Sequence, residues 1–192
     1  MRLIVGISGS TGAIYGVRLL QILRERLPEI EVHLVMSEGA RATIAYETEY
    51  APDEVATWAH TVHKSGNVGA SIASGTYITA GMIVAPCSMK TLSSIAASYN
   101  DNLMTRAADV CLKERRRLVL LVRETPLHLG HLRLMTAVTE AGGIILPPVP
   151  GFYQRPKTIL DLVDHSLGKA LDLFGVEHNL YPRWSGLTTP DI

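Results

Sequence analysis

MRLIVGISGSTGA, residues 1–13, is the stretch of sequence that decides the fold of this chain. A short apolar run ends at Ile7, a turn of small residues follows, and a helical pattern begins at Ala13. A strand, a glycine-rich turn and a helix in this order expose backbone N–H groups at the positive end of the helix dipole, where phosphates bind. The sequence therefore predicts a phosphate-binding turn at the start of an α/β protein.

The spacing of the glycines in this turn narrows the kind of nucleotide. Gly6, Gly9 and Gly12 form a G-x-x-G-x-x-G pattern, whereas dinucleotide binding requires G-x-G-x-x-G and an acidic residue closing the second strand. The second apolar run ends at Met36-Ser37 without an acid, and no Lys-Ser or Lys-Thr closes the turn as in a triphosphate-binding loop. The turn therefore predicts a mononucleotide rather than NAD or ATP.

Short apolar runs alternate with helical patterns along the rest of the chain. Each run is continuously apolar, which is typical of parallel strands covered by helices on both faces. The pattern predicts an α/β fold with an open, doubly wound parallel sheet, in one domain over residues 1–192 with a C-terminal tail from about 175. The predicted strands are 3–7, 31–36, 82–85, 118–122 and 143–146, with a weaker one at 61–64, and the predicted helices are 13–26, 89–98, 102–116, 129–141 and 157–174.

Composition argues against two classes of partner. The chain has a formal net charge of +0 and is 47% hydrophobic, which does not fit the clustered positive charge that nucleic-acid binding needs. No stretch reaches the roughly 20 apolar residues of a membrane span. Cys87 and Cys111 lie far apart without a C-x-x-C pair, so neither a disulfide framework nor a zinc site is indicated. We expect a cytoplasmic protein that binds neither nucleic acid nor membranes.

The loops that follow the strands carry the candidate chemistry, because ligands of doubly wound sheets bind beyond the carboxyl ends of the strands. Ser88 opens a helix after a buried run, so it can contribute to an anion site or simply cap the helix. Arg123 and Glu124 directly follow the run 118–122. An arginine there can bind a phosphate or a flavin carbonyl and a carboxylate can transfer a proton, while a structural ion pair is the alternative.

Other polar residues lack such a position. Glu47 lies between helix-like segments and is predicted from periodicity to be a solvated acid. The pairs His60/His63 and His128/His131 have an i, i+3 spacing but no third ligand in register, which favours surface or helix-capping histidines over a metal site. Three further residues could form a second anionic pocket, which spacing alone does not establish: Lys113, Tyr153 and Lys169.

Several longer segments carry a resemblance to a known family. The sequence resembles the UbiX-type flavin prenyltransferases, which include subunits of hydroxyarylic and phenolic acid decarboxylase systems. The resemblance runs from the first strand to the tail. Its segments are Gly6-Ile7-Ser8-Gly9-Ser10-Thr11-Gly12-Ala13, Glu47-Thr48, Pro86-Cys87-Ser88, Arg106-Ala107-Ala108-Asp109-Val110, Leu112-Lys113-Glu114-Arg115-Arg116, Arg123-Glu124-Thr125-Pro126, Pro150-Gly151-Phe152-Tyr153 and Pro182-Arg183-Trp184.

The resemblance implies a Rossmann-like or flavodoxin-like fold of three layers that binds FMN. The reaction it implies joins a dimethylallyl group from dimethylallyl phosphate to N5 and C6 of reduced FMN, and the product, prenylated FMN, serves a UbiD-type aromatic acid decarboxylase. It also implies a homo-oligomer, a dodecamer, with sites formed between subunits and no metal. The residues that would contact FMN are Gly9, Ser10, Thr11, Ser37, Ser88, Met89, Lys90, Thr91 and Arg123.

By the same resemblance, Tyr153 and Lys169 would hold dimethylallyl phosphate, Glu47 would lie beside the phosphate, and Lys113 and Glu124 would lie near the reacting groups. Cationic and hydroxyl groups stabilise a departing phosphate, and aromatic faces stabilise an allyl cation. Closing the new ring requires proton transfers, for which either glutamate is a candidate.

Two positions depart from the commoner family pattern: Thr11 replaces a serine, and Lys169 replaces an arginine and lacks its bidentate fork.

Two alternative functions stay open. An FMN-dependent decarboxylase of the cysteine-decarboxylase type would carry Pro-Ala-Ser-Ala-Asn-Thr where this chain has Pro86-Cys87-Ser88-Met89-Lys90-Thr91. A non-catalytic flavin-binding subunit would not need Lys113, Glu124 or Tyr153.

Overall fold

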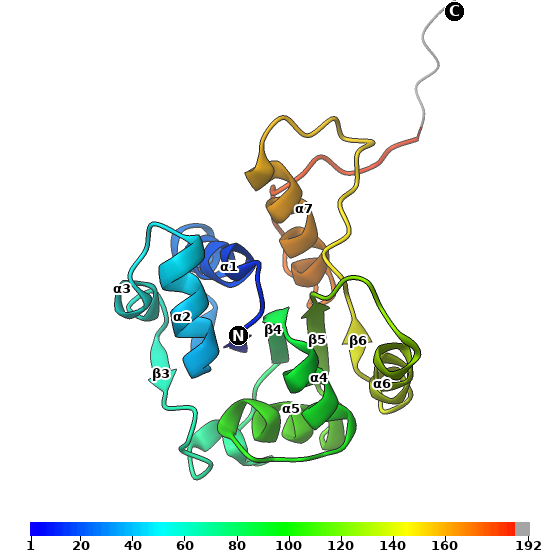
Figure 1. Cartoon of the computed structure of the whole chain (residues 1–192). Helices are drawn as coiled ribbons and strands as arrows, with labels where there is room; N and C mark the ends of the chain where they lie inside the picture. The colour runs from blue at the N-terminus through cyan, green and yellow to red at the C-terminus, as the bar shows by residue number, and fades with distance from the viewer. Residues whose placement is uncertain (187–192) are drawn as a thin grey trace, which may run out of the picture. The chain divides into compact units, whose positions relative to one another are not determined.

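The computed structural model describes residues 1–186. The chain forms two compact units, Met1–Pro148 and Val149–Ile192, and Figure 1 labels their helices and strands. The single domain predicted over residues 1–192, with a tail from about 175, stays a prediction.

The first unit contains a six-stranded parallel sheet with the order β3-β2-β1-β4-β5-β6. This finding confirms the predicted doubly wound fold, because the chain winds outward from β1 in one direction and from β4 in the other. The predicted bounds of β2 are confirmed, whereas β6 is shorter than predicted. The strands are β1 (Arg2–Ile7), β2 (Glu31–Met36), β3 (Thr61–His63), β4 (Gly81–Cys87), β5 (Arg117–Val122) and β6 (Ile144–Ile145).

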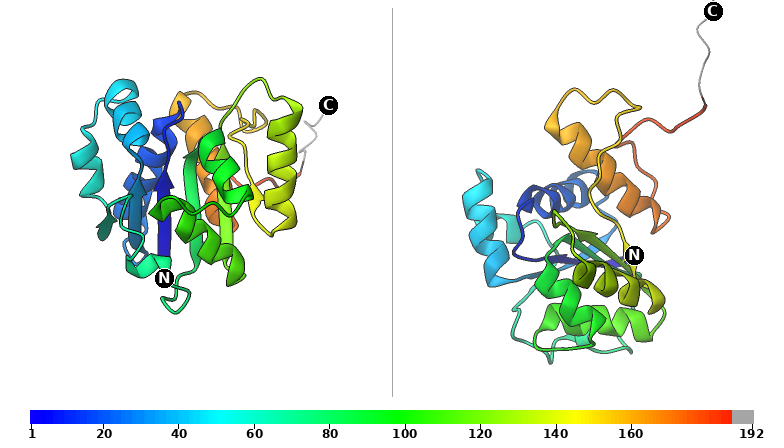
Figure 2. Two further views of the ribbon diagram at one scale, coloured as in Figure 1. Left: turned by 60° about the horizontal axis from the view of Figure 1, so that its bottom comes forward. Right: turned by 45° about the vertical axis from the view of Figure 1, so that its right-hand side comes forward.

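Helices cover both faces of this sheet, and in Figure 2 α1 lies on one face and α4, α5 and α6 lie on the other. The predicted bounds of α1 are confirmed, and α4, α5 and α6 are each shorter than predicted. The short elements α2, α3 and η1 were not predicted. The helices are α1 (Ala13–Arg26), α2 (Glu38–Glu47), α3 (Pro52–Ala56), η1 (Ser71–Ala73), α4 (Met89–Ala96), α5 (Leu103–Lys113) and α6 (Leu129–Glu140).

Two glycines allow the helices to approach the strands closely. A Cβ atom on Gly16 of α1 would lie 2.4 Å from the carbonyl oxygen of Ala85 in β4. On the opposite face, a Cβ atom on Gly6 of β1 would lie 3.4 Å from Cγ of Met104 in α5. Residues 3–7 of β1 are buried because both faces are covered, which explains the continuously apolar strands.

The second unit is built around α7 (Ile159–Asp172), somewhat shorter than the predicted helix 157–174. Thr158 and Asp161 form a capping box at its first turn, in which each side chain accepts a backbone N–H group of the other residue. The chain after α7 returns along it, since His178 contacts the carbonyl oxygen of Gly168 at 3.0 Å. Within residues 1–186, no helix combines the length and apolarity needed to cross a membrane.

Candidate functional site

The strand order reverses between β1 and β4, so the ligand crevice of this fold lies beyond the carboxyl ends of these two strands. Ser8 joins the two loops there. Its buried hydroxyl donates to the carbonyl oxygen of Pro86 at 2.9 Å and accepts the backbone N–H of Ser88 at 2.7 Å. The buried Ser8 hydroxyl therefore fixes the glycine turn against the loop that opens α4. The sequence prediction gave no role to this residue.

The glycine turn also lies against the start of α2. A Cβ atom on Gly9 would lie 2.8 Å from the Cα and carbonyl carbon of Gly39, so the two backbones approach too closely for any other residue. Beside it, the side-chain oxygen of Ser10 is buried and has no hydrogen-bond partner within the described residues. An orphaned hydroxyl in a turn of closely packed backbone fits a bound phosphate or another polar ligand group.

Glu47 is exposed, as periodicity predicts, but its carboxylate is bound by backbone groups of the protein. Its carboxylate accepts the backbone N–H groups of Gly12 at 2.8 Å and Ala13 at 2.9 Å, at the first turn of α1. This negative charge therefore occupies the positive end of the α1 dipole. The sequence predicts that N–H groups at this helix start bind a phosphate. In the structure, two of these N–H groups donate to a carboxylate of the protein itself.

The pKa of Glu47 is lower than its ordinary value. Burial is the largest influence and raises the pKa, but hydrogen bonds from Thr11, Ala13 and Gly12 and the positive charge of Arg123 outweigh it. Glu47 is consequently a stable carboxylate near neutral pH. The positive charge of Arg123 therefore favours the ionised form of Glu47.

Serines begin the next two helices along the same edge. The Ser37 side chain accepts the N–H of Ala40 at 3.0 Å and caps α2. The Ser88 side chain accepts the N–H of Thr91 at 3.3 Å and donates to the Thr91 hydroxyl at 3.2 Å, capping α4. The capping alternative for Ser88 is therefore confirmed, and its predicted contact with FMN stays a prediction.

The remaining predicted residues of this edge have different partners. Met89 packs against the core beneath α4, and Lys90 forms an ion pair with Asp101 at 2.9 Å. Arg123 is half-buried, and its backbone N–H donates to the carbonyl oxygen of Cys87 at 3.1 Å, which places it beside the β4 loop. Glu124 is exposed and accepts the N–H of Thr125 at 2.9 Å.

Lys113 lies at the other end of the sheet. It is the last residue of α5, forms an ion pair with Glu114, and comes just before the amino end of β5. The crevice lies beyond the carboxyl end of β5, which has six residues and is about 20 Å long at 3.3 Å per residue. Within one chain, Lys113 therefore lies roughly a strand length from the crevice.

The second unit holds both residues predicted to bind dimethylallyl phosphate. Tyr153 is 55% exposed, and its hydroxyl lies 3.2 Å from Nε2 of His165 on α7. Lys169 is exposed one helical turn further along α7. Burial and, secondarily, the charge of Lys169 lower the pKa of His165. The sequence prediction missed His165, although its i, i+4 spacing from Lys169 was a signal that could have found it.

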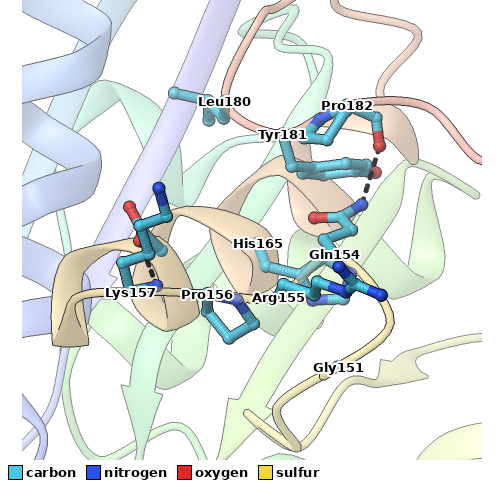
Figure 3. Close-up of a pocket in the computed structure, with 10 residues that line it drawn as sticks. Gly151, Gln154, Arg155, Pro156, Lys157, His165, Leu180, Tyr181 and Pro182 are labelled. Carbon is cyan, nitrogen blue, oxygen red and sulfur yellow. Dashed lines mark hydrogen bonds between the residues drawn. The ribbon is translucent and has the colours of Figure 1, made fainter.

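A pocket of about 220 Å³ lies beside the pair Tyr153 and His165, and Figure 3 shows the residues that line it. The Tyr181 ring packs on His165 with ring centroids 4.9 Å apart, and the Tyr181 hydroxyl donates to Asp172. Arg183 binds the same carboxylate at 2.7 Å. The pocket is lined by Gly151, Gln154, Arg155, Pro156, Lys157, Asp161, His165, Leu180, Tyr181 and Pro182.

One histidine of each predicted pair accepts a backbone N–H group. His128 caps α6 by accepting the N–H of Gly130 at 3.0 Å, and His60 accepts the N–H of Val32 at 3.0 Å. Over residues 1–186, no group of three or more His, Cys, Asp or Glu side chains is arranged to hold a metal ion.

Comparison with known proteins agrees with this geometry. A family model described as flavoprotein matches residues 1–167. Together with the reversal of strand order between β1 and β4, this match defines the class of the protein as an α/β flavoprotein.

The flavin prenyltransferase UbiX of Thauera aromatica is 57% identical over 186 residues, covering 97% of this chain and 95% of that protein. Two solved structures align with a TM-score of 0.94 each. One is AnUbiX (PadA1) in complex with FMN and dimethylallyl pyrophosphate, at 49% identity over 97% of this chain and 98% of that chain. The other is a dodecameric FMN-dependent UbiX-like decarboxylase from Escherichia coli O157:H7, at 51% identity over 97% and 100%. The chain belongs to the UbiX family of flavin prenyltransferases.

Proposed function

We propose that this protein is a flavin prenyltransferase that joins the dimethylallyl group of dimethylallyl phosphate to reduced FMN. The observation that carries the proposal is the orphaned Ser10 hydroxyl beside the close approach of Gly9 to Gly39, in the loop that follows β1. A relative of 49% identity binds FMN together with dimethylallyl pyrophosphate. The product, prenylated FMN, would pass to a UbiD-type decarboxylase, and a cytoplasmic location stays a prediction.

The residues of the crevice fit a bound flavin mononucleotide. In this proposal the Ser10 hydroxyl and the serine-capped helix starts at Ser37 and Ser88 bind the phosphate end, and Arg123 binds polar atoms of the flavin. Bound reduced FMN supplies the ring positions N5 and C6 that receive the prenyl group. The full set of proposed FMN contacts is Gly9, Ser10, Thr11, Ser37, Ser88, Met89, Lys90, Thr91 and Arg123.

The two glutamates receive different roles. Glu47 already accepts two backbone N–H groups and has a lowered pKa, so it is a poor proton donor and instead orders the glycine turn. Glu124 accepts a single backbone N–H from its neighbour Thr125 and is exposed. We assign the proton transfer to Glu124.

The allylic phosphate is assigned to cations and a hydroxyl. Tyr153 and Lys169 of the second unit bind its oxygens and stabilise the charge that develops as the C–O bond breaks. Lys113 acts in the site of a neighbouring copy, because within its own chain it lies at the amino end of β5. The dodecameric relative of 51% identity supports such an assembly.

The test is anaerobic incubation of the protein with reduced FMN and dimethylallyl phosphate, followed by mass spectrometry of the extracted flavin. The proposal predicts a flavin heavier by one five-carbon prenyl unit, and Glu124→Gln should slow its formation more than it weakens FMN binding. Recovery of unmodified FMN alone would contradict the proposal.

A decarboxylase is the second candidate, because the relative of 51% identity is described as one. Incubation of the FMN-loaded protein with a phenolic acid separates the two functions. The proposed prenyltransferase releases no carbon dioxide by itself and supports release only after a UbiD-type enzyme is added. Carbon dioxide release by the protein alone would favour the decarboxylase.

A further inference from the structure

His165 is a buried polar residue that contacts the predicted substrate ligand Tyr153, and the proposed function gives it no role. Its side chain is only 8% exposed, and Nε2 lies 3.2 Å from the hydroxyl of Tyr153. The two rings meet edge to face, with centroids 5.8 Å apart and an angle of 82° between their planes. Nδ1 of the same imidazole is buried and has no hydrogen-bond partner within residues 1–186.

The surrounding residues fix this pair in place. The Tyr181 ring packs on the His165 ring at 4.9 Å, and Trp184 meets the Tyr153 ring edge to face at 5.5 Å. Gly151 makes room for the contact, since a Cβ atom there would lie 3.0 Å from Cε1 of both His165 and Tyr153. Within residues 149–186, the polar contact of the His165 ring is with the Tyr153 hydroxyl.

When substrate is bound, the number of available protons determines which group donates in the hydrogen bond between the Tyr153 hydroxyl and Nε2 of His165. A tyrosine hydroxyl has one proton, while a phosphate oxygen can only accept. If Tyr153 binds the allylic phosphate, its proton points to the phosphate, and the contact with His165 persists only if the imidazole donates. Burial and the nearby Lys169 both disfavour a second proton on this ring, so the single proton of the neutral ring must lie on Nε2.

We propose that His165 is a positioning residue that donates from Nε2 to the Tyr153 oxygen and so directs the Tyr153 proton to the phosphate of the allylic substrate. This inference rests on the proposed function of Tyr153 as a phosphate ligand. His165 acts through Tyr153 and does not touch the reacting atoms. The assignment leaves Nδ1 without a proton, so the buried atom that lacks a partner is an acceptor and not an N–H donor.

The test is a double-mutant cycle of Tyr153→Phe and His165→Phe, measured on the FMN-loaded protein as the Kd for dimethylallyl phosphate and as the KM and kcat of flavin prenylation. His165→Phe keeps an aromatic ring and removes the donor. We expect it to raise Kd and KM about threefold to tenfold, the effect of one lost hydrogen bond, with a smaller effect on kcat. In the Tyr153→Phe background, the same change should have no further effect, because the hydroxyl on which it acts is gone.

Two further variants separate positioning from structural support. His165→Gln can place a side-chain amide N–H near the same oxygen and should restore most of the affinity. His178→Gln alters another buried histidine of this unit, one that contacts Asp172 at 3.1 Å and not Tyr153, and any effect it has should be equal in both backgrounds. If His165→Phe does not fold, His165→Leu takes its place with the same expectations.

The outcomes also separate this inference from the proposed function. Equal effects of His165→Phe with and without the Tyr153 hydroxyl, or a His165→Gln variant as weak as the Phe variant, would overturn the inference while prenylation by the wild type persists. If the wild type binds dimethylallyl phosphate with this coupling but forms no prenylated flavin, the proposed function fails and the inference stands. If the wild type does not bind dimethylallyl phosphate, both fail.

Discussion

The contact between Gly9 and Gly39 predicts a large effect from a single added methyl group. In a Gly9→Ala variant, the new Cβ would lie 2.8 Å from the Cα and carbonyl carbon of Gly39, where ordinary contacts begin at 3.4 Å. Both neighbours are backbone atoms, so the glycine turn and the start of α2 must move apart. Overpacking of this kind costs about 1–3 kcal/mol, which lowers Tm by roughly 2–12 °C in a protein of this size.

The same displacement should weaken FMN binding, because Ser10 follows Gly9 directly. Loss of one hydrogen bond to the ligand corresponds to an increase in Kd of about fivefold. Gly66→Ala is the matched control, since a Cβ atom there would meet nothing within 4 Å, and we expect its Tm to stay within about 2 °C of the wild type. Thermal unfolding and fluorescence titration with FMN measure both effects. A Gly9→Ala protein that behaves like Gly66→Ala in both assays would refute the reasoning about this crevice.

Three further predictions concern charged residues. Because the pKa of Glu47 is lower in the folded protein, its contribution to folding stability is present above the ordinary pKa of 4.5 and is lost as the pH falls through the lower folded-state pKa. In urea unfolding, the Glu47→Gln variant should therefore lose less stability between neutral and acidic pH than the wild type. Identical pH profiles of the two proteins would contradict this prediction. Lys113→Ala should be inactive alone, yet co-assembly with an inactive Glu124→Ala chain should restore part of the prenylation activity, which would not happen if both residues served the same chain. Lys169→Ala should raise the KM for dimethylallyl phosphate about tenfold while the Kd for FMN stays within twofold, and an equal loss of both would place Lys169 at the flavin instead.

The parts of the fold that were predictable from the sequence are those whose burial leaves a pattern. Residues 3–7 and 32–36 are buried and are largely apolar in sequence, and α1 buries a wide stripe of apolar side chains. The helix α2 buries only Ala40 and Ile44 of its ten residues. Its amphipathic signal is too weak to detect, although Ser37 was a visible capping residue.

Site residues were predictable where their position in the fold follows directly from the sequence. Arg123 and Glu124 follow a strand directly, so the fold rule places them at the crevice. Glu47 reaches the start of α1 only because α2, which was not predicted, carries it there. The position of Lys113 at the opposite end of β5 likewise depends on where α5 ends, and an assembly is required to bring it to a crevice. No local pattern encodes contacts of either kind.

The central claim is that the carbon–oxygen bond of dimethylallyl phosphate breaks as the flavin is modified. The most direct measurement is the amount of inorganic phosphate released per prenylated FMN formed, in an anaerobic reaction of the purified protein with reduced FMN and dimethylallyl phosphate. The account predicts that the two products appear together in equal amounts and that neither appears without FMN. Phosphate release without a modified flavin would contradict it.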